Sequence, residues 1–280
     1  MSAATRTWIN GEVVTALPLP DRGLDYGDGL FETMPIIDGN IPWLSYHLER
    51  LHQGLQQLEF HSEAHSPVRD YIGTALDDCP VTGVMRLTLT RGTGMRGYAP
   101  PEPAWPTCIV QTSCADSAGQ PALAPANVGL CSVTLAKQPL LAGIKHLNRL
   151  EQVLAARERQ QKGLDEMLMT DTSGSAISVI SGNIFLVKDN QLLTPTLADC
   201  GILGTRRRLV LDELAPALGL DCLQVTITAA EVASADEAFY CNSLRGYQPI
   251  GRYGDRRWRR YPTIERLQAL YRERLLTCAA

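Results

Sequence analysis

The sequence predicts an α+β protein of two domains. Its 280 residues exceed the usual size of one domain. Between Cys114 and Asn127 the composition shifts to Ala, Ser, Gly, Pro and Asp with no periodicity, as in a linker. Short apolar runs typical of strands lie on both sides of it, beside separate helical patterns. We therefore expect a small N-terminal domain over 1–114, a linker over 115–126 and a larger C-terminal domain over 127–280.

Two hairpin signals open the chain. Asn10-Gly11 lies between short apolar runs, and a two-residue hairpin turn needs φ > 0 at both positions, which Asn and Gly tolerate. Asp38-Gly39 repeats the signal between Met34–Ile37 and Ile41. Between the two hairpins, residues 21–33 are dense in glycine and acid. Their backbone either approaches another group closely or forms an ordinary loop.

An amphipathic helix should follow, because leucines recur at residues 44, 48, 51, 55 and 58. Arg50 lies at the edge of that stripe, where a surface arginine is the alternative to a binding role. Residues 85–90 alternate apolar and polar side chains and predict a half-buried strand. The glycine-rich loop Arg91–Tyr98 comes next, and its two arginines and tyrosine could hold a carboxylate.

In the second domain, residues 167–193 should form a run of strands with little helix. The closing helix of this domain carries Ile264, Leu267, Leu270 and Leu275. The strands and turns follow from apolar runs and polar breaks. We expect strands near 128–135, 167–169, 176–179, 184–187, 191–193, 225–227 and 238–241, with turns at Asp189-Asn190 and Asn242-Ser243.

A further helix should open after Gly201 and Gly204 and end at Gly219, with apolar residues such as Leu209 and Leu214 on one side. A helix N-terminus presents several backbone N–H groups beside the positive end of the dipole, which suits a phosphate. The two glycines allow a close approach. A plain helix cap is the alternative.

Composition and charge exclude several classes of function. A net charge of −4 without a long basic run argues against nucleic acid and anionic membranes as partners. The start of the chain lacks the apolar core of a signal peptide, and no stretch reaches about 18 apolar residues, so we expect a soluble, cytoplasmic protein. The eight cysteines are scattered, without metal-like spacing. They are expected to be reduced and mostly buried, and no metal site is expected.

Lys145 is the most informative single residue. The chain has only four lysines, and this one lies between an apolar turn and an expected helix that carries Leu147, Leu150 and Leu154 and ends at Gly163. A lysine beside a helix N-terminus is unfavourable against the dipole, so the position suggests a functional reason. The alternative is a solvated residue at a helix start.

Five motifs in order are more specific than any one of them. They are Asp21-Arg22 with Tyr26-Gly-Asp-Gly-Leu-Phe-Glu-Thr33, His47-Leu-Glu-Arg50-Leu51, Lys145-His-Leu-Asn-Arg-Leu-Glu151, Gly182-Asn-Ile-Phe185 and Cys200-Gly-Ile-Leu-Gly-Thr-Arg206. Across nearly the whole chain, the set resembles the class IV aminotransferases, which are fold type IV enzymes dependent on pyridoxal 5'-phosphate. Within that family, Gly143–Gln152 and Arg91–Tyr98 resemble the lyases that act on 4-amino-4-deoxychorismate.

The resemblance implies a fold, an activity and a partner. The fold would be the two-domain fold type IV architecture, with a small N-terminal α/β domain and a larger C-terminal domain that has a β-barrel-like core and flanking helices. The activity would convert 4-amino-4-deoxychorismate to 4-aminobenzoate and pyruvate, a step of folate biosynthesis. Family members are generally homodimers, which implies a second copy of this chain as partner.

The resemblance also assigns residues to the cofactor. Lys145 would be the Schiff-base lysine, and near phosphate donors and a cationic cofactor its pKa should fall, which favours the neutral nucleophile. The phosphate would be held by Arg50, by the backbone N–H groups of Thr205 and Arg206, and by Ser243. Arg50 suits this role, because the planar guanidinium group of an arginine matches the oxygens of a phosphate.

Substrate-side roles follow in the same way. The freed Lys145 would remove the proton at the carbon bearing the substrate's amine, and Thr33 could help deliver a proton to the departing pyruvate. Arg96 and Tyr98 are the expected contacts for the substrate carboxylates.

Ser178 departs from the family pattern. Five residues before the Asn of Gly182-Asn-Ile-Phe185, the family usually has a glutamate that keeps the pyridine nitrogen protonated. A hydroxyl can donate a hydrogen bond there but supplies no negative charge. A shift of one residue would instead put Ile177 or Val179 at this position.

The departure leaves three functions open. Aromatisation of the product drives the lyase reaction, so the change counts less against a lyase than against an aminotransferase for D- or branched-chain amino acids. The third possibility is a cofactor-binding protein with weakened chemistry.

Overall fold

The computed structural model describes residues 5–61, 64, 67–79, 81–115 and 124–279. The chain divides into two compact units, which are described separately. Unit 1 comprises Met1–Gly119, Ile144–Asn148 and Cys278–Ala280, and unit 2 comprises Gln120–Gly143 and Arg149–Thr277. Of the predicted linker, residues 116–123 lie outside the described residues.

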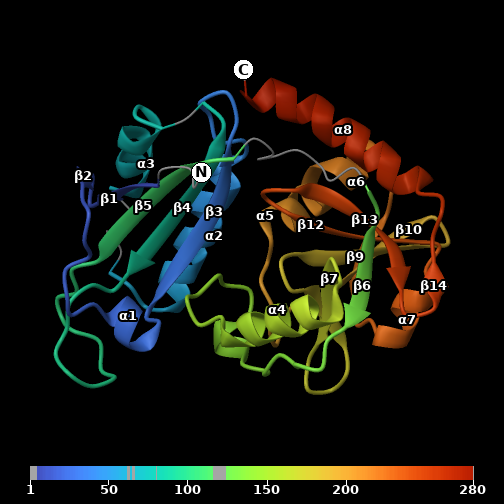
Figure 1. Ribbon diagram of the computed structural model, residues 1–280, viewed down its shortest axis with the longest axis horizontal. Coiled ribbons are helices and arrows are strands. Elements are labelled where there is room, and N and C mark those ends of the chain that lie inside the picture. The colour runs from blue at the N-terminus through green and yellow to red at the C-terminus, as the bar shows by residue number, and fades with distance from the viewer. Residues whose placement is uncertain (1–4, 62–63, 65–66, 80, 116–123, 280) are drawn as a thin grey trace. The chain divides into compact units, whose positions relative to one another are not determined.

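Unit 1 contains an antiparallel sheet in the order β2-β1-β5-β4-β3, with α2 packed on β3 and α3 on β5 (Figure 1). Its elements are β1 Arg6–Ile9, β2 Glu12–Val13, α1 Arg22–Tyr26, β3 Gly29–Ile36, α2 Leu44–Gln57, α3 Val68–Leu76, β4 Gly83–Thr90 and β5 Thr107–Cys114.

The first hairpin is confirmed, and the second is reduced to its turn. Trp8 pairs with Val13 across the turn at Asn10 and Gly11, and both turn residues have positive φ. The turn at 38–39 also has positive φ, but only an isolated bridge, Ile37 to Asn40, follows it. All eight residues of β3 pair with β4 instead, so the chain after the turn continues into α2.

The predicted helix and strand of unit 1 are both present. In α2, Leu51 and Leu55 are buried, and in β4, Met85, Leu87 and Leu89 are buried as the alternation predicts. Two short helices, α1 and α3, were not expected. Residues 22–26 form α1 within the glycine-rich stretch, because the Asp21 side chain caps the Gly23 N–H and Gly27 ends the helix in the left-handed conformation.

Unit 2 contains a curled, mixed sheet in the order β11-β10-β9-β12-β13-β6-β7-β8, with β14 beside β13 (Figure 1). The pairs β10–β11, β13–β6 and β6–β7 are parallel. Its strands are β6 Ala126–Leu130, β7 Glu166–Thr170, β8 Ala176–Val179, β9 Asn183–Lys188, β10 Gln191–Pro195, β11 Cys222–Val225, β12 Glu237–Asn242, β13 Gly246–Tyr253 and β14 Arg256–Arg257.

The helical segments of unit 2 accompany this curled half-barrel sheet, which confirms the predicted α+β class. They are η1 Pro139–Leu141, α4 Leu150–Lys162, α5 Thr205–Leu209, η2 Val210–Leu214, α6 Ala215–Ala217, α7 Ala229–Ser234 and α8 Pro262–Ala279. The segments α5, η2 and α6 are continuous, with a π-helical turn in the middle.

Two strand predictions in unit 2 need correction, and one strand was missed. β6 ends at Leu130, so the strand expected to reach residue 135 is short, although Leu135 makes an isolated bridge to Asp171. β11 ends at Val225, earlier than expected. β13 was missed because Pro249 and the glycines of that segment have low strand propensity, which pairing with β12 and β6 overrides.

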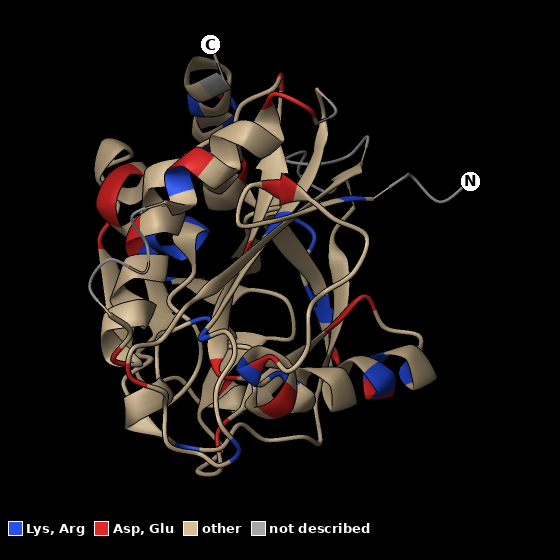
Figure 2. Ribbon diagram, turned by 90° about the vertical axis from the view of Figure 1, so that its left-hand side faces the viewer, with Lys and Arg blue, Asp and Glu red and all other residues tan. Residues whose placement is uncertain are grey.

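Charge and cysteines agree with an ordinary globular chain. Basic and acidic residues are interspersed along the ribbon in Figure 2. All eight cysteines are free thiols, and burial raises the pKa of Cys108 and Cys241 to about 12. Cys108, Cys131, Cys200 and Cys241 are buried, whereas Cys114 and Cys278 are exposed. Among the described residues, no helix is long and apolar enough to cross a membrane.

Candidate active site

Lys145 lies on an extended segment beside β3, not at a helix start. The Phe31 N–H donates to the Lys145 carbonyl at 3.0 Å, and the Leu147 N–H donates to the Gly29 carbonyl at 3.0 Å. Helix α4 begins only at Leu150, so the expected helix start at the lysine is wrong. These backbone bonds hold residues 145–147 extended, and the argument from the helix dipole therefore does not apply to the lysine.

The predicted apolar face of the lysine helix is also wrong. In α4, Leu150 and Leu154 are 77% and 54% exposed. Their helical spacing is real, but it does not mark a face buried within this chain. The predicted end of the helix is confirmed, because Gly163 adopts the left-handed conformation there.

The lysine amine contacts an aromatic ring. Lys145 Nζ lies 4.2 Å from the centroid of the Phe31 ring, and the Arg86 guanidinium lies 4.3 Å from the same centroid. Phe31 is buried and Lys145 is half-buried. The ring therefore gives the amine one fixed, largely apolar contact, here called the lysine platform.

Glycines make room for this segment, so the close approach holds, of the two alternatives left open for residues 21–33. A Cβ at Gly29 would lie 2.4 Å from the Leu89 carbonyl oxygen and 2.9 Å from Leu147 Cδ1. A Cβ at Gly27 would lie 2.4 Å from Asn148 Oδ1, and the Asn148 amide donates to the Gly27 carbonyl at 3.2 Å. Any side chain at either glycine would push residues 145–148 away from β3.

Thr33 of β3 and Arg50 of α2 lie on opposite sides of β3. Successive strand residues point to opposite faces, so Thr33 shares a face with Phe31, whose ring contacts Lys145, whereas Glu32 points to the other face. Arg50, on α2, binds Glu32 on that other face. Thr33 therefore lies two residues from Phe31 on the same face of the strand. The role of Arg50 in binding phosphate stays a prediction.

Glu32, which the sequence analysis missed, organises a buried charged cluster. Arg50 donates through Nε to Oε1 at 2.8 Å and through Nη2 to Oε2 at 2.5 Å, and His47 Nδ1 lies 2.6 Å from Oε2. Burial alone would raise the pKa of Glu32, but the charges and hydrogen bonds of Arg50 and His47 outweigh it and hold that pKa at about 2. Arg50 is thus a largely enclosed arginine, 10% exposed and oriented by Glu32, instead of a fully solvated surface residue.

Arg96 and Tyr98 lie on a loop whose side chains are exposed. Tyr98 is 88% exposed, and Arg96 is exposed as well. Their backbone is nevertheless held, because Arg22 of α1 donates to the carbonyl oxygens of Gly97, Tyr98 and Ala99. The expected contacts of these two residues with substrate carboxylates stay a prediction.

In unit 2, the helix predicted to hold phosphate begins at Thr205, as expected. Its N-cap is Gly204, which has no side chain to satisfy the first N–H groups, and Thr205 and Arg206 are both buried. A buried helix start without a side-chain cap fits an anion such as phosphate.

Asn183 sets the loop that leads into this helix start. Its amide donates to the Ile202 carbonyl at 2.8 Å, and a Cβ at Gly204 would lie 2.0 Å from its Oδ1. The asparagine of the Gly182–Phe185 motif is therefore a positioning residue for the candidate phosphate site. The sequence analysis quoted the motif but gave this residue no role.

Replacing Gly204 with alanine should weaken both stability and cofactor binding. The new methyl group collides with the Asn183 amide, and such overpacking costs about 1–3 kcal/mol. We expect a lower unfolding midpoint in urea and a higher dissociation constant for pyridoxal phosphate by equilibrium dialysis. Gly73→Ala is the control, because a Cβ at Gly73 meets nothing within 4 Å. If Gly204→Ala matched Gly73→Ala in both measurements, the close packing would be of no consequence.

Arg206 and Arg207 are both buried and serve the fold through their own contacts. The Arg207 Nη2 donates to the Pro195 carbonyl at 3.1 Å and to Gln224 Oε1 at 2.8 Å. The Tyr247 hydroxyl donates to the Arg206 carbonyl at 3.2 Å. These bonds hold the first turn of α5 against β10, β11 and β13, so the backbone N–H groups at the helix start are fixed in direction.

Ser178 and Ser243 lie on separate elements of unit 2. Ser178 is half-buried on β8 and pairs with Met169 of β7, whereas its neighbour Ile177 belongs to the hydrophobic core. Ser243 follows β12, in a turn where Asn242 Oδ1 accepts from the Leu244 and Arg245 N–H groups. Their roles toward a cofactor stay predictions.

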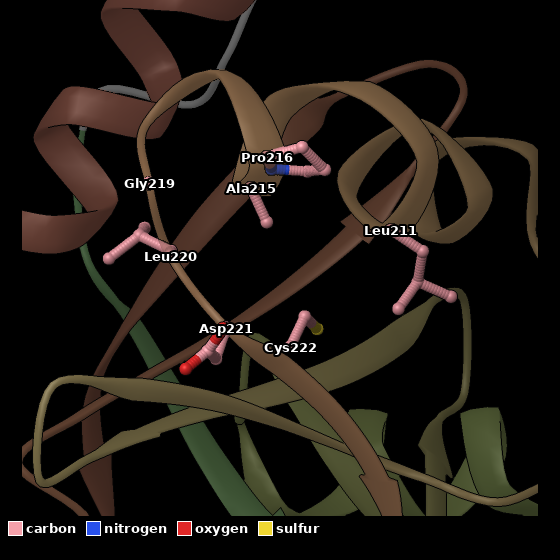
Figure 3. Close-up of a pocket in the computed structure, with 7 residues that line it drawn as sticks. All are labelled: Leu211, Ala215, Pro216, Gly219, Leu220, Asp221 and Cys222. Carbon is pink, nitrogen blue, oxygen red and sulfur yellow. The ribbon is translucent and has the colours of Figure 1, made fainter.

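A separate pocket of about 420 Å³ contains none of these residues (Figure 3). Burial raises the pKa of Cys222 in its wall to about 11, so this thiol stays protonated at neutral pH. We therefore place no chemistry there. The lining residues are Leu211, Ala215, Pro216, Gly219, Leu220, Asp221 and Cys222.

Comparisons with known proteins agree on one family. A family model described as "Amino-transferase class IV" matches residues 29–253. An aminodeoxychorismate lyase of Vibrio harveyi is 33% identical over 87% of this chain and 89% of its own length. A putative branched-chain-amino-acid aminotransferase of Methanocaldococcus jannaschii is 27% identical over 88% of this chain and 86% of its own length.

Among solved structures, the crystal structure of 4-amino-4-deoxychorismate lyase from Pseudomonas aeruginosa is similar with a TM-score of 0.88. It is 36% identical in sequence, and the match covers 95% of this chain and 98% of that one. The similarity therefore extends through both units.

Proposed function

Because the chain belongs to the class IV aminotransferase family and has its fold type IV architecture, we propose that it is a pyridoxal 5'-phosphate-dependent lyase. The reaction converts 4-amino-4-deoxychorismate to 4-aminobenzoate and pyruvate, a step of folate biosynthesis. The supporting observation is similarity at 33% and 36% identity to two proteins described as lyases of this substrate. We further propose that the enzyme works as a homodimer.

The residues present fit the cofactor that this family uses. Unit 2 offers the buried, uncapped helix start at Thr205 and Arg206, which suits a phosphate, and unit 1 offers a lysine amine on an aromatic platform. We assign the phosphate to these two N–H groups, with Arg50 and Ser243, and the ring nitrogen to the hydroxyl of Ser178.

In the proposed mechanism, the bound cofactor supplies an electron sink for the carbon that bears the substrate's amine. Lys145 would hold the cofactor, and its amine, once released, would remove the proton from the carbon that bears the substrate's amine. The departing pyruvate takes a proton, for which Thr33 is the donor that we assign. Loss of the proton and of pyruvate leaves an aromatic ring, and Arg96 and Tyr98 hold the substrate carboxylates.

Ser178 favours elimination over transamination. A serine hydroxyl can donate to the ring nitrogen but cannot supply the negative charge of a glutamate. Formation of an aromatic product drives the lyase reaction, so a weaker electron sink suffices. Transamination forms no aromatic product and therefore lacks a comparable driving force.

A coupled assay tests the function. Aminodeoxychorismate synthase with chorismate, glutamine and this protein should release pyruvate and 4-aminobenzoate in equal amounts, measured with lactate dehydrogenase and by chromatography. D-Alanine and branched-chain amino acids should convert little of the cofactor to its pyridoxamine form. Rapid and complete conversion by these amino acids, without pyruvate release from the chorismate derivative, would establish the opposite assignment.

An aminotransferase for D- or branched-chain amino acids is the second candidate, supported by the similarity to the archaeal aminotransferase. A cofactor-binding protein with weakened chemistry is the third, suggested by the serine at residue 178. The third candidate predicts that the protein takes up pyridoxal phosphate and releases no pyruvate. The assay above therefore separates all three.

A further inference from the structure

We propose that Arg22 is a positioning residue that fixes the loop of residues 92–100, here the Arg96 loop, and through it the substrate specificity of the enzyme. This inference rests on the proposed function for its substrate, but not for its structural part. All residues concerned belong to unit 1. The Asp21-Arg22 pair, noted in the sequence as part of the resemblance, thereby acquires a physical role in this chain.

The guanidinium of Arg22 binds three consecutive carbonyl oxygens of the loop. Nη1 donates to Gly97 at 3.0 Å and to Ala99 at 3.3 Å, and Nη2 donates to Tyr98 at 2.8 Å. Three acceptors around one planar fork determine the path of the backbone on both sides of Tyr98. A lysine amine, a single point of charge, cannot serve the same three acceptors in this geometry.

The Nε side of the Arg22 guanidinium is fixed by an ion pair with Asp28. Arg22 Nε donates to Asp28 Oδ2 at 2.9 Å, and Arg91 Nε donates to the same carboxylate at 2.9 Å and 3.1 Å. The Arg22 and Arg91 side chains are only 5% and 7% exposed. Asp28 therefore links Arg22 to Arg91, the residue from which the loop departs.

Arg91 is itself held by the residues that follow α2. Its guanidinium donates to the Leu58 and Glu59 carbonyl oxygens at 2.6 Å and 3.2 Å and stacks 4.0 Å from the Phe60 ring centroid. The start of the Arg96 loop is therefore rigidly placed, and Arg22 provides the second point of attachment.

Tyr26, one helical turn after Arg22, supports the same part of the loop. Its ring centroid lies 4.9 Å from the Arg22 guanidinium and 5.5 Å from the Tyr98 ring, and its hydroxyl accepts from the Gly97 N–H at 3.2 Å. Residues four apart share a helix face, so α1 presents both side chains to the loop.

Helix α1 is anchored firmly enough to act as a support. The Arg22 N–H donates to the Gly92 carbonyl at 2.9 Å, and the Thr90 hydroxyl donates to Asp21 Oδ2 at 2.8 Å. A Cβ at Gly23 would lie 2.3 Å from Thr90 Cγ2, so α1 sits tightly on the end of β4. A loop that binds α1 is therefore also anchored to the sheet through β4.

The loop has little apolar packing of its own to keep its shape. Met95, Tyr98 and Arg96 are exposed, with Met95 and Tyr98 each at 88%. Its conformation must therefore come from backbone attachments, and Arg22 makes three of them. The side chains of Arg96 and Tyr98 stay available for a negatively charged substrate while their backbone is held.

The test compares Arg22→Gln and Arg22→Lys with the control Arg69→Gln, which removes an exposed arginine from α3 in the same unit. With 4-amino-4-deoxychorismate, we expect Arg22→Gln to raise KM about tenfold or more, with a much smaller change in kcat. Cofactor loading, measured by absorbance, should equal that of the wild type. Arg22→Lys should rescue KM only in part.

A double-mutant cycle separates positioning from a general structural effect. In a background that carries Arg96→Ala and Tyr98→Phe, the Arg22→Gln change should alter KM less than about twofold, because the groups it positions are already gone. The same increase in KM in both backgrounds would show that Arg22 does not act through this loop and would overturn the proposal.

Trypsin provides a readout that does not depend on activity. The bond after Arg96 is the cleavage site within the exposed part of the loop, and Arg22→Gln should speed its cleavage about tenfold, as judged by mass spectrometry of the fragments. Arg69→Gln should be cleaved like the wild type. If Arg22→Gln does not fold, Arg22→Lys carries the test, and a wild-type cleavage rate in the folded variant rejects the proposal.

The two readouts also distinguish the two proposals. A wild-type enzyme that releases no pyruvate would reject the lyase assignment, whereas accelerated trypsin cleavage in the same preparation would still support the role of Arg22 in holding the loop. An active lyase with unchanged cleavage and unchanged KM in Arg22→Gln would support the function and reject the role of Arg22.

Discussion

Lys145→Ala should lower pyruvate release from 4-amino-4-deoxychorismate by roughly 10³-fold or more, because it removes both the covalent attachment and the base. Borohydride should no longer fix the cofactor to the protein, and the absorption of the covalently bound cofactor near neutral pH should disappear. Stability should change little, since Lys145 is half-buried and its contact with the Phe31 ring is a single cation–π interaction.

The other lysines are poorer candidates for covalent attachment. Lys137 Nζ lies 3.1 Å from Asp171, and this hydrogen bond, which outweighs the lowering by desolvation, raises the pKa of Lys137, so its amine stays protonated. Lys162 pairs with Glu158 at 2.6 Å on the exposed face of α4. A protonated amine such as that of Lys137 is a weak nucleophile, and the amine of Lys162 is engaged by its ion pair.

Lys188→Ala, which removes an exposed lysine at the end of β9, is the matched control and should keep wild-type activity. Peptide mapping of the borohydride-reduced protein should place the cofactor on Lys145. If the label appeared instead on Lys137, Lys162 or Lys188, the site assignment in unit 1 would be wrong even if the lyase activity were present.

Local patterns in the sequence predicted the type of most long elements. The hairpin at Asn10-Gly11, the alternating strand β4 and the turn at Asp189-Asn190 depend on neighbouring residues, and all three are present. Helix α5 also begins where its glycines indicated. Such features follow from local φ preferences and side-chain periodicity, which a single sequence contains.

The surroundings of the lysine could not be predicted in the same way. The helical periodicity around Lys145 was misleading, because residues 145–147 pair with β3 instead. The paired residues are more than a hundred positions apart in sequence, so no local pattern indicates this contact. The resemblance to a family pointed to Lys145 as the candidate lysine but did not specify its conformation. Phe31 became the platform only through the register of that pairing, which no local pattern specifies.

The cluster of Glu32, His47 and Arg50 was even harder to predict from local patterns in the sequence. Arg50 was found as a lone arginine at a helix edge, and its partner is a strand residue 18 positions earlier. An acid within the apolar run of β3 was the available signal, because a buried carboxylate in a strand requires a partner. Which cation satisfies it depends on how α2 packs on β3.

Glu32→Gln should produce the largest loss of stability among these variants. Glu32 is 1% exposed, and the neutral amide leaves the charge of Arg50 buried without its counterion. Removing one partner of a buried ion pair costs about 3–5 kcal/mol. Urea unfolding at pH 7 should show this loss, whereas Glu12→Gln, at an exposed position on β2, should leave the midpoint unchanged.

The pH dependence of stability should change in the same variant, in a defined direction. The pKa of Glu32 is about 2 in the folded chain against an ordinary value of 4.5, so its ionisation stabilises the wild type above about pH 4.5. The stabilisation, roughly 3 kcal/mol from the difference in pKa, is lost as the pH falls from 4.5 toward 2.

Because Gln does not titrate, the difference in unfolding free energy between Glu32→Gln and the wild type should shrink over that range of pH. A difference that stayed constant from pH 7 to pH 3 would mean that the loss comes from packing and not from charge. Pyridoxal phosphate affinity then decides the role of Arg50. If Glu32 orients Arg50 toward the phosphate, Glu32→Gln weakens cofactor binding in dialysis even at pH 7, where most of the variant is still folded, whereas an unchanged affinity would make Arg50 a purely structural partner of Glu32.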